Sequence, residues 1–387
     1  MDGAGFPAHI SWWRSLPAQI RNNLPQHQSA SSQCGTIHQG AFMEDTIKPH
    51  LAATIAALLA PGKGILAADE SLPTIGKRFA ALAIASTEEN RRAYRELLFT
   101  TPGVGDAISG VILFDETIRQ QIAGHPMPEV LAGRGIIPGI KVDLGAVALA
   151  GFPGEKITQG LDGLRERLAQ YRELGAKFTK WRAVLAVGDG RPTPTCIQAN
   201  ARALALYAAL AQEAGLVPII EPEVLMDGNH SIDRCEEVTR TVLQSVFSLL
   251  SEHRVALAGM LLKTGMVLPG KDCPQQADAG QVATATLRCL HAAVPTAVPG
   301  IVFLSGGQSD VAATERLNAI CRPAGAPWQL TFSYGRALQD AAMKTWRGVP
   351  ANVPAAQAAF HLRARCNSLA VQGDYTEQAE HDGPASR

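Results

Sequence analysis

Lys263 ends the segment Gly259-Met260-Leu261-Leu262-Lys263, whose apolar side chains are typical of a buried β-strand. An unpaired ammonium group is costly to bury, so a lysine in such a place tends to lose its proton. The neutral amine is a nucleophile towards carbonyl carbon, and the protonated Schiff base that it forms stabilises a carbanion equivalent on the next carbon. The sequence therefore predicts covalent chemistry on a carbonyl compound, with Lys263 as the nucleophile. The alternative is a lysine whose stem packs on the protein while its ammonium reaches solvent.

Three other strand-like segments each end in a pair of charged side chains. The pairs are Lys141 and Asp143, Lys180 and Arg182, and Glu221 and Glu223. Because side chains alternate along a strand, the two members of each pair share a face. We expect these faces to meet near Lys263, where the like charge of Lys180 would lower the pKa of the Lys263 amine further. A ring of structural ion pairs is the alternative interpretation.

Two carboxylates are candidates for proton transfer. Burial raises and nearby lysines lower the pKa of Glu221, so we expect a value tuned towards the working pH, as a general acid and base requires. Asp69 ends the segment Ala67-Ala68-Asp69 and is expected to take a proton from a substrate hydroxyl. The alternatives are a salt bridge between Glu221 and Lys180 without a chemical role, and an N-cap formed by Asp69.

Two groups of residues are candidate phosphate sites. The sequence Ser305-Gly306-Gly307-Gln308-Ser309 follows a predicted strand and opens a predicted helix, where backbone N–H groups bind phosphate. Arg336 follows the next strand, in Ser333-Tyr334-Gly335-Arg336, and is placed to clamp the same anion. Lys77 and Arg78 come shortly after Asp69 and are expected to hold a second phosphate across the mouth of the site. An ordinary glycine turn is the alternative for Gly306-Gly307.

Eight strand-like segments must position these residues. They cover residues 64–69, 108–114, 136–143, 178–182, 217–223, 259–263, 300–305 and 329–334. Helical patterns cover residues 158–174, 194–214, 231–252, 276–293, 309–320 and 352–369, and Ser231 is a predicted N-cap. Strands that alternate with helices pair in parallel, and eight strands close a barrel. The sequence therefore predicts an α/β fold, a single-domain (β/α)8 TIM barrel with its active site at the C-terminal strand ends. An open doubly wound sheet is disfavoured because no glycine-rich phosphate loop follows the first strand.

Composition narrows the functional classes. Hydrophobic residues make up 46% and charged residues 18%, which indicates a globular protein. Lys+Arg 35 balances Asp+Glu 35, so we expect neither nucleic acid nor a membrane surface as a partner. No apolar run reaches the length of a membrane span. The 7 Cys are scattered without metal-ligand spacing, which favours reduced thiols in the cytoplasm and no metal.

Residues 1–42 differ from the rest of the chain and are rich in Ser, Gln, Asn, Pro and Gly. We expect them to form a disordered N-terminal extension, or to lie upstream of a true start at Met43. Residues 43–370 are expected to form the barrel with its C-terminal helix, and residues 371–387 a polar tail.

Motifs from seven of these strands, together with Lys263 at the end of the remaining one, resemble in order the class I fructose-bisphosphate aldolases, which form a Schiff base. The matching sequences are Gly64-Ile65-Leu66-Ala67-Ala68-Asp69-Glu70-Ser71, Gly110-Val111-Ile112-Leu113-Phe114, Gly139-Ile140-Lys141-Val142-Asp143, Lys180-Trp181-Arg182, Glu221-Pro222-Glu223, Leu304-Ser305-Gly306-Gly307-Gln308-Ser309 and Phe332-Ser333-Tyr334-Gly335-Arg336. The resemblance implies reversible cleavage of fructose 1,6-bisphosphate to dihydroxyacetone phosphate and glyceraldehyde 3-phosphate, as in glycolysis and gluconeogenesis. It also implies a cytoplasmic homotetramer that needs no cofactor or metal and whose partners are phosphorylated ketose and triose substrates.

The resemblance also implies a role for each site residue. Lys263 corresponds to the Schiff-base lysine, Glu221 to the acid and base of Schiff-base formation, and Asp69 to the residue that handles the hydroxyl proton during cleavage. The further residues are the catalytic-site cations Lys141 and Lys180, and the substrate- and phosphate-binding residues Arg182, Glu223, Ser305, Gly306, Gly307, Ser333, Arg336, Ser71, Lys77 and Arg78.

Three positions depart from the animal members of this family. Thr264-Gly265 stands where those enzymes have Pro-Asn, and Thr74 replaces a serine near the second phosphate. The last tyrosine is Tyr375, whereas the animal chains end in a tyrosine that reaches the active site. The sequence leaves open the preference between the bisphosphate and fructose 1-phosphate. Two other functions are a metal-assisted isomerase or lyase, and a non-catalytic protein that binds sugar phosphates or the cytoskeleton on the same fold.

Overall fold

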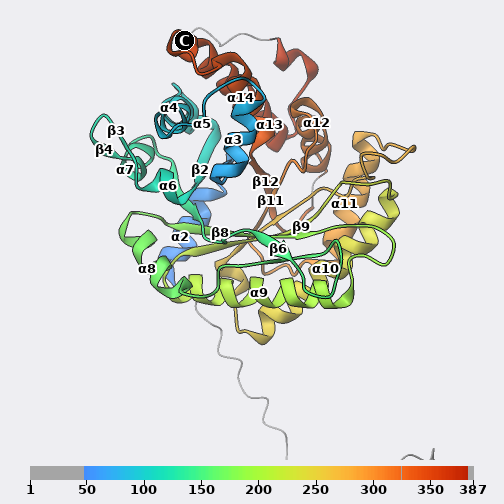
Figure 1. Cartoon of the computed structure of the whole chain (residues 1–387). Coiled ribbons are helices and arrows are strands. Elements are labelled where there is room, and N and C mark those ends of the chain that lie inside the picture. The colour runs from blue at the N-terminus through green and yellow to red at the C-terminus, as the bar shows by residue number, and fades with distance from the viewer. Residues whose placement is uncertain (1–47, 324, 382–387) are drawn as a thin grey trace, which may run out of the picture. The chain divides into compact units, whose positions relative to one another are not determined.

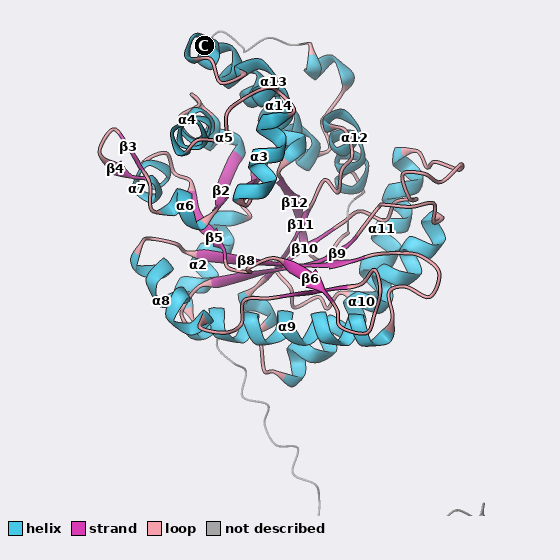
Figure 2. Cartoon of the chain, viewed as in Figure 1, coloured by secondary structure: helices cyan, strands magenta, loops and turns pink. Residues whose placement is uncertain are grey.

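The computed structural model describes residues 48–323 and 325–381, within a compact unit from Asp45 to Arg387. Its central element is a closed barrel of parallel strands, in the order β1-β12-β11-β10-β9-β8-β5-β2. Helices surround the strands (Figures 1 and 2). The prediction of a (β/α)8 barrel is confirmed. The barrel strands are β1 (Gly64–Ala68), β2 (Ile108–Leu113), β5 (Ile137–Lys141), β8 (Phe178–Leu185), β9 (Val217–Val224), β10 (Leu261–Thr264), β11 (Gly300–Phe303) and β12 (Gln329–Tyr334).

Two short hairpins lie outside the barrel and were not predicted. β3 (Gln121–Ile122) pairs with β4 (His125–Pro126), and β6 (Ala146–Ala148) pairs with β7 (Lys156–Thr158). The second hairpin changes a prediction, because it places residue 158 in a strand. The helix expected over residues 158–174 is therefore shorter, and α8 covers only Leu164–Glu173.

The helices begin where side chains satisfy free backbone N–H groups. Ser231 accepts a hydrogen bond from Arg234 N at 3.2 Å, as predicted, and Asp278 forms a capping box that starts its helix later than expected. The main helices are α2 (Pro49–Leu58), α3 (Leu72–Ala80), α4 (Glu88–Phe99), α5 (Val104–Ala107), α6 (Asp115–Ile118), α7 (Met127–Ala132), α9 (Pro194–Glu213), α10 (Ile232–Glu252), α11 (Ala279–Ala293), α12 (Asp310–Cys321), α13 (Arg336–Trp346) and α14 (Val353–Gln372). Short 3₁₀ turns are η2 (Leu257–Gly259), η3 (Pro350–Asn352) and η4 (Glu377–Glu380).

The N-terminal end of the barrel is filled with apolar side chains. Leu51, Ile55 and Leu58 of α2 form one buried cluster with inward-facing residues from the first halves of the strands, among them Phe178 and Leu261. The ring of Phe178 needs a glycine opposite, since a Cβ at residue 139 would lie 2.3 Å from it. With this end closed, charged side chains can face a cavity only at the C-terminal end.

The chain after the last barrel helices packs onto α14. Tyr375 and Ala379 are buried, and the hydroxyl of Tyr375 donates to Glu380 Oε1 at 2.7 Å. Arg363 Nη2 donates to the same carboxylate at 2.9 Å. The proposed domain boundaries stay predictions, and residues 1–42 lie outside the described part of the chain. Among the described residues, no helix has both the length and the apolar character of a membrane span.

Candidate active site

Four charged side chains meet inside the C-terminal end of the barrel. Lys263 Nζ lies 3.2 Å from Glu221 Oε1, and Lys180 Nζ lies 3.2 Å from Glu221 Oε2. Lys180 Nζ also lies 2.6 Å from Asp69 Oδ2. Lys263, Lys180 and Glu221 are each only 3% exposed. The structure therefore brings the predicted nucleophile and both predicted proton carriers into one buried cluster.

Strand order and register explain this convergence. β9 lies between β8 and β10 in the barrel, so Glu221 stands between the strands of Lys180 and Lys263. Lys180 pairs in register with Ile219, two residues before Glu221 on the same face of β9. Asp69 directly follows β1, which borders only β2 and β12. Its contact with Lys180 therefore crosses the barrel interior.

Electrostatics in the cluster keep its carboxylates charged. Burial alone would raise the pKa of Asp69, but the charges of Lys180 and Lys263 outweigh it and lower the pKa to about 2. Burial also acts to raise the pKa of Glu221, and the same two lysines overcome it and lower the pKa. Burial alone would lower the pKa of Lys180, whereas Asp69 and Glu221 reverse this effect and raise it.

The directions of these pKa shifts correct one prediction from the sequence and leave another untested. The expectation that the pKa of Glu221 lies near the working pH was wrong in direction, because the charge of Lys180, together with that of Lys263 when it is protonated, outweighs burial. The prediction that Lys263 is neutral stays a prediction. Within the described residues, Ser333 Oγ is buried and makes no hydrogen bond. Buried polar atoms without partners call for an explanation, and polar groups of a substrate would supply it.

Asp143 organises the rim beside the cluster. Lys141 Nζ lies 2.6 Å from Asp143 Oδ1 and donates to the Asp143 carbonyl at 2.7 Å. The carboxylate also accepts from Arg182 N at 3.2 Å and from Gly145 N at 3.1 Å. Arg182 Nε contacts Glu223 Oε2 at 2.5 Å, so the predicted pairs on β8 and β9 do meet.

The structure also brings the two parts of the first predicted phosphate site together. Gly306 and Gly307 have φ values of +60° and +94°, which other residues rarely adopt. A Cβ at Gly307 would lie 3.3 Å from Arg336 Nη2, so this guanidinium lies against the glycine turn. Ser305 is buried, whereas Arg336 at the first position of α13 is exposed. We call residues 305–307 the anion loop.

The second predicted phosphate site is not assembled in the same way. Arg78 contacts Glu70 and also Asp340 Oδ1 at 2.8 Å, so its charge is compensated by carboxylates. Lys77 is exposed on the same helix, and the Ser71 hydroxyl lies 3.1 Å from Thr74 Oγ1. Successive helical residues point about 100° apart, so Lys77 and Arg78 face different surroundings. Their phosphate role stays a prediction.

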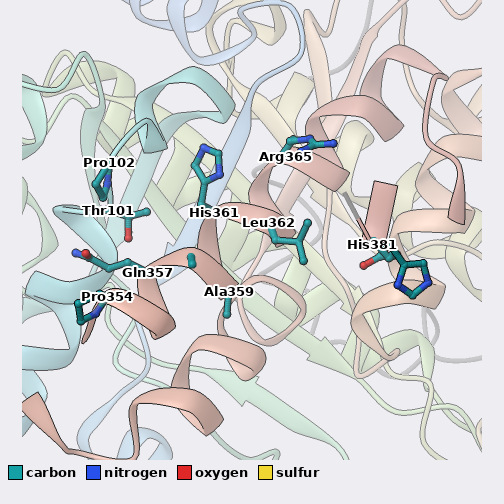
Figure 3. A pocket seen from close by; sticks show the side chains of 11 residues that line it. Thr101, Pro102, Pro354, Gln357, Ala359, His361, Leu362, Arg365 and His381 are labelled. Carbon is teal, nitrogen blue, oxygen red and sulfur yellow. The ribbon is translucent and has the colours of Figure 1, made fainter. Parts of the chain in front are cut away.

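A separate cavity of about 540 Å³ lies on α14, away from all of these residues. Figure 3 shows its labelled side chains, which include Thr101, His361, Leu362 and His381. None of the predicted site residues lines it. We place the chemistry in the barrel, because the buried lysine predicted as the nucleophile and the two carboxylates predicted as proton carriers are there.

Comparison with known proteins decides the family. A family profile described as fructose-bisphosphate aldolase class-I matches residues 50–386. The chain belongs to the class I fructose-bisphosphate aldolase family. It is 56% identical over 327 residues to the probable fructose-bisphosphate aldolase class 1 of Xanthomonas campestris pv. campestris, covering 84% of this chain and 98% of the relative. It is 52% identical over 349 residues to fructose-bisphosphate aldolase 5, cytosolic, of Arabidopsis thaliana, covering 90% and 96%.

A solved aldolase structure has the same fold. The fructose-bisphosphate aldolase from Plasmodium falciparum, solved in complex with TRAP and a small-molecule inhibitor, is 50% identical with a TM-score of 0.84. The match covers 85% of this chain and 95% of that one. The resemblance stated from sequence motifs is confirmed, and the protein is an aldolase of the lyase class.

Two residues of this aldolase site were not selected from the sequence. Asp143 was paired with Lys141 but not named as a site residue, although its spacing was the available signal. Gln308 lies 8% exposed behind the anion loop, where it donates to the Ser305 carbonyl at 2.9 Å. No sequence pattern distinguishes this glutamine from an ordinary turn residue. Among the described residues, no group of His, Cys, Asp and Glu is arranged to hold a metal ion.

Proposed function

We propose that this aldolase cleaves fructose 1,6-bisphosphate, and forms it again from dihydroxyacetone phosphate and glyceraldehyde 3-phosphate, through a Schiff base on Lys263. One observation carries the mechanism: a buried lysine amine lies 3.2 Å from a carboxylate that also contacts a second lysine. Family membership supports the reaction, and this geometry supports the residue.

The first step joins Lys263 Nζ to the ketose C2 carbon. The nitrogen lone pair forms the new bond while the carbonyl π electrons move to oxygen, which leaves as water after it gains two protons. Glu221 lies beside both lysines, so it can pass protons between the amine and the leaving oxygen. Its low pKa means that it carries protons only transiently.

The second step breaks the bond between C3 and C4. Asp69 takes the proton of the C4 hydroxyl, the C4–O bond becomes a carbonyl, and the C3–C4 electron pair moves into the protonated imine. Asp69 is ionised at neutral pH because its pKa is about 2, so it is in the state that accepts a proton. The ammonium of Lys180, 2.6 Å away, stabilises negative charge at this point.

Phosphate binding is assigned to the cations around this cluster. The anion loop and Arg336 bind the phosphate next to the ketose carbonyl, since a glycine turn that opens a helix and an exposed guanidinium lie against one another there. Lys141 and Arg182 are rim cations, and Glu223 and Ser333 are polar contacts for the sugar. Ser71, Lys77 and Arg78 form the second phosphate site.

We also propose a cytoplasmic homotetramer. The cytosolic names of the Arabidopsis relatives support the location. The hairpin of β6 and β7 supports assembly, because Leu144 is 68% and Val147 is 39% exposed beside the exposed alanines of β6. Apolar side chains gathered on one exposed hairpin are typical of a surface that another chain covers.

Reductive trapping tests the proposed mechanism. Borohydride added with dihydroxyacetone phosphate should fix the substrate carbon skeleton on Lys263, and peptide mapping should find the label there. Lys177→Ala is a suitable control, since this exposed lysine precedes β8 outside the cluster and its loss should leave labelling unchanged. Labelling of another lysine, or none, would refute the assignment.

A further inference from the structure

Arg316 of α12 is a half-buried arginine without an acidic partner. No carboxylate lies within ion-pair distance of it among the described residues. Burial lowers the pKa of its guanidinium, and only the neighbouring Glu315 acts in the opposite direction. A partly desolvated cation normally has a carboxylate beside it, so its retention here requires another explanation.

The hydrogen bonds of Arg316 lead to Gln308. Arg316 Nη1 donates to Gln308 Oε1 at 2.8 Å, and Nη2 reaches the Ala277 carbonyl at 3.5 Å. The amide of Gln308 then donates to the Ser305 carbonyl at 2.9 Å and contacts Met266 Sδ at 3.7 Å. One buried amide therefore connects α12, the anion loop and the segment that follows β10 and Lys263.

The bond to Ser305 fixes the direction of a backbone donor. The Ser305 carbonyl accepts from both the side chain of Gln308 and its backbone N, the latter at 3.0 Å. In a planar trans peptide, the carbonyl and the following N–H point in opposite directions. Because the Ser305 carbonyl is hydrogen-bonded to Gln308, the Gly306 N–H of the same peptide points away from Gln308. Gly306, with φ +60°, would otherwise allow this peptide to rotate.

We propose that Arg316 is a positioning residue: through Gln308 it holds the Gly306 N–H in the direction that binds the ketose phosphate. This inference rests on the proposed function, because it assigns that phosphate to the anion loop. Arg316 does not touch the substrate. It polarises the Gln308 amide, which strengthens the bond to Ser305, and hydrogen-bonded chains reinforce one another in this way. An arginine whose charge no carboxylate neutralises suits this positioning role, because its positive charge also attracts the phosphate.

Arg316→Met tests the inference in the full-length enzyme. We expect the KM for fructose 1,6-bisphosphate and the inhibition constant of inorganic phosphate to rise about tenfold, the effect of one lost charge-assisted hydrogen bond. We expect kcat to stay within about threefold, because the lysine cluster is untouched. Arg322→Met is the matched control: this arginine caps the same helix, donates to the Gly373 carbonyl at 3.3 Å, and should change neither constant.

Gln308→Glu separates positioning from stability. The new carboxylate would pair with Arg316, so the melting temperature should not fall. It would face the Ser305 carbonyl with an acceptor in place of a donor, so phosphate affinity should drop at least about tenfold. If Arg316→Met does not fold, Arg316→Lys and Gln308→Glu carry the test. Gln308→Met combined with Arg316→Met should be no weaker than the weaker of these two single variants, since both remove the same contact.

Three results would overturn the inference: unchanged phosphate affinity in folded variants, a fall in kcat with KM unchanged, or fully multiplicative effects of the two substitutions. Borohydride trapping, carried out in parallel, distinguishes a failure of the positioning role of Arg316 from a failure of the proposed Schiff-base mechanism. If the Schiff-base assignment is wrong, the native enzyme itself will not be labelled on Lys263. If only the positioning is wrong, native enzyme and variants will be labelled at the same dihydroxyacetone phosphate concentrations.

Discussion

The ammonium of Lys180 on β8 lies 2.6 Å from the carboxylate of Asp69, although β1, which Asp69 follows, does not border β8 in the barrel. The contact spans the interior, and Lys180 also contacts Glu221. Lys180 is therefore shared by the two proposed proton carriers. Any change in its position or charge acts on both the formation of the imine and the cleavage of the carbon–carbon bond.

Lys263→Met should abolish cleavage while leaving the fold intact. The nucleophile is lost, and removal of one such group typically lowers the rate by about 10⁴-fold or more. Glu221 keeps its contact with Lys180, so the buried carboxylate is not left alone. An assay of cleavage together with thermal melting checks this. Substantial activity in the folded variant would contradict the proposed role.

Lys180→Met should destabilise the protein far more than Lys263→Met. It leaves two buried carboxylates, Asp69 and Glu221, with Lys263 as their nearest remaining cation. Breaking a buried ion pair by removing one partner costs about 3–5 kcal/mol. Urea unfolding of both variants at the same pH measures the difference. Equal stabilities would mean that the two lysines are equivalent, against the geometry.

Acid should weaken the fold through Asp69. Its pKa is lowered from 3.8 to about 2, so its stabilising contribution is complete above about pH 3.8 and is lost as the pH falls towards 2. The contribution is about 2 kcal/mol. Unfolding free energies measured between pH 6 and pH 2.5 should fall less steeply in Asp69→Asn than in the native protein. Glu237→Gln changes an exposed carboxylate and is the control, so its unfolding free energy should depend on pH as in the native protein. The same pH dependence in Asp69→Asn would contradict the prediction.

Arg336→Ala should raise the KM for fructose 1,6-bisphosphate by about tenfold to a hundredfold, since hydrogen bonds to charged groups contribute about 1.5–3 kcal/mol. The effect should be larger on KM than on kcat, because the guanidinium lies at the anion loop and outside the lysine cluster. Lys344→Ala removes an exposed charge from the same helix and serves as the control. An unchanged KM would remove the phosphate role of Arg336.

Chelators should leave the activity unchanged. A lysine imine supplies the electron sink that a metal ion would supply in a metal-dependent lyase. Activity assays before and after incubation with EDTA and dialysis check this. Loss of activity that added Zn²⁺ restores would favour the metal-assisted alternative raised from the sequence.

The sequence predicts the barrel and the cluster because both follow from alternation along buried strands. Lys180, Glu221 and Lys263 each stand at a strand end with apolar neighbours, so their shared direction could be inferred. The direction of the pKa shift of Glu221 could not be inferred, because it depends on how many ammonium groups lie near this carboxylate. The compensation of Arg78 by Glu70 and Asp340 also escaped prediction, since Asp340 comes from a helix far along the chain. The hairpin of β6 and β7 was missed because its strands are too short to show a period.

Apolar side chains of α2 close the N-terminal end of the barrel, so its C-terminal end is the side open to a substrate. A hexose bisphosphate must arrive, and both trioses must depart, through that same opening. Either triose, when abundant, should therefore compete with the bisphosphate for the same end of the barrel.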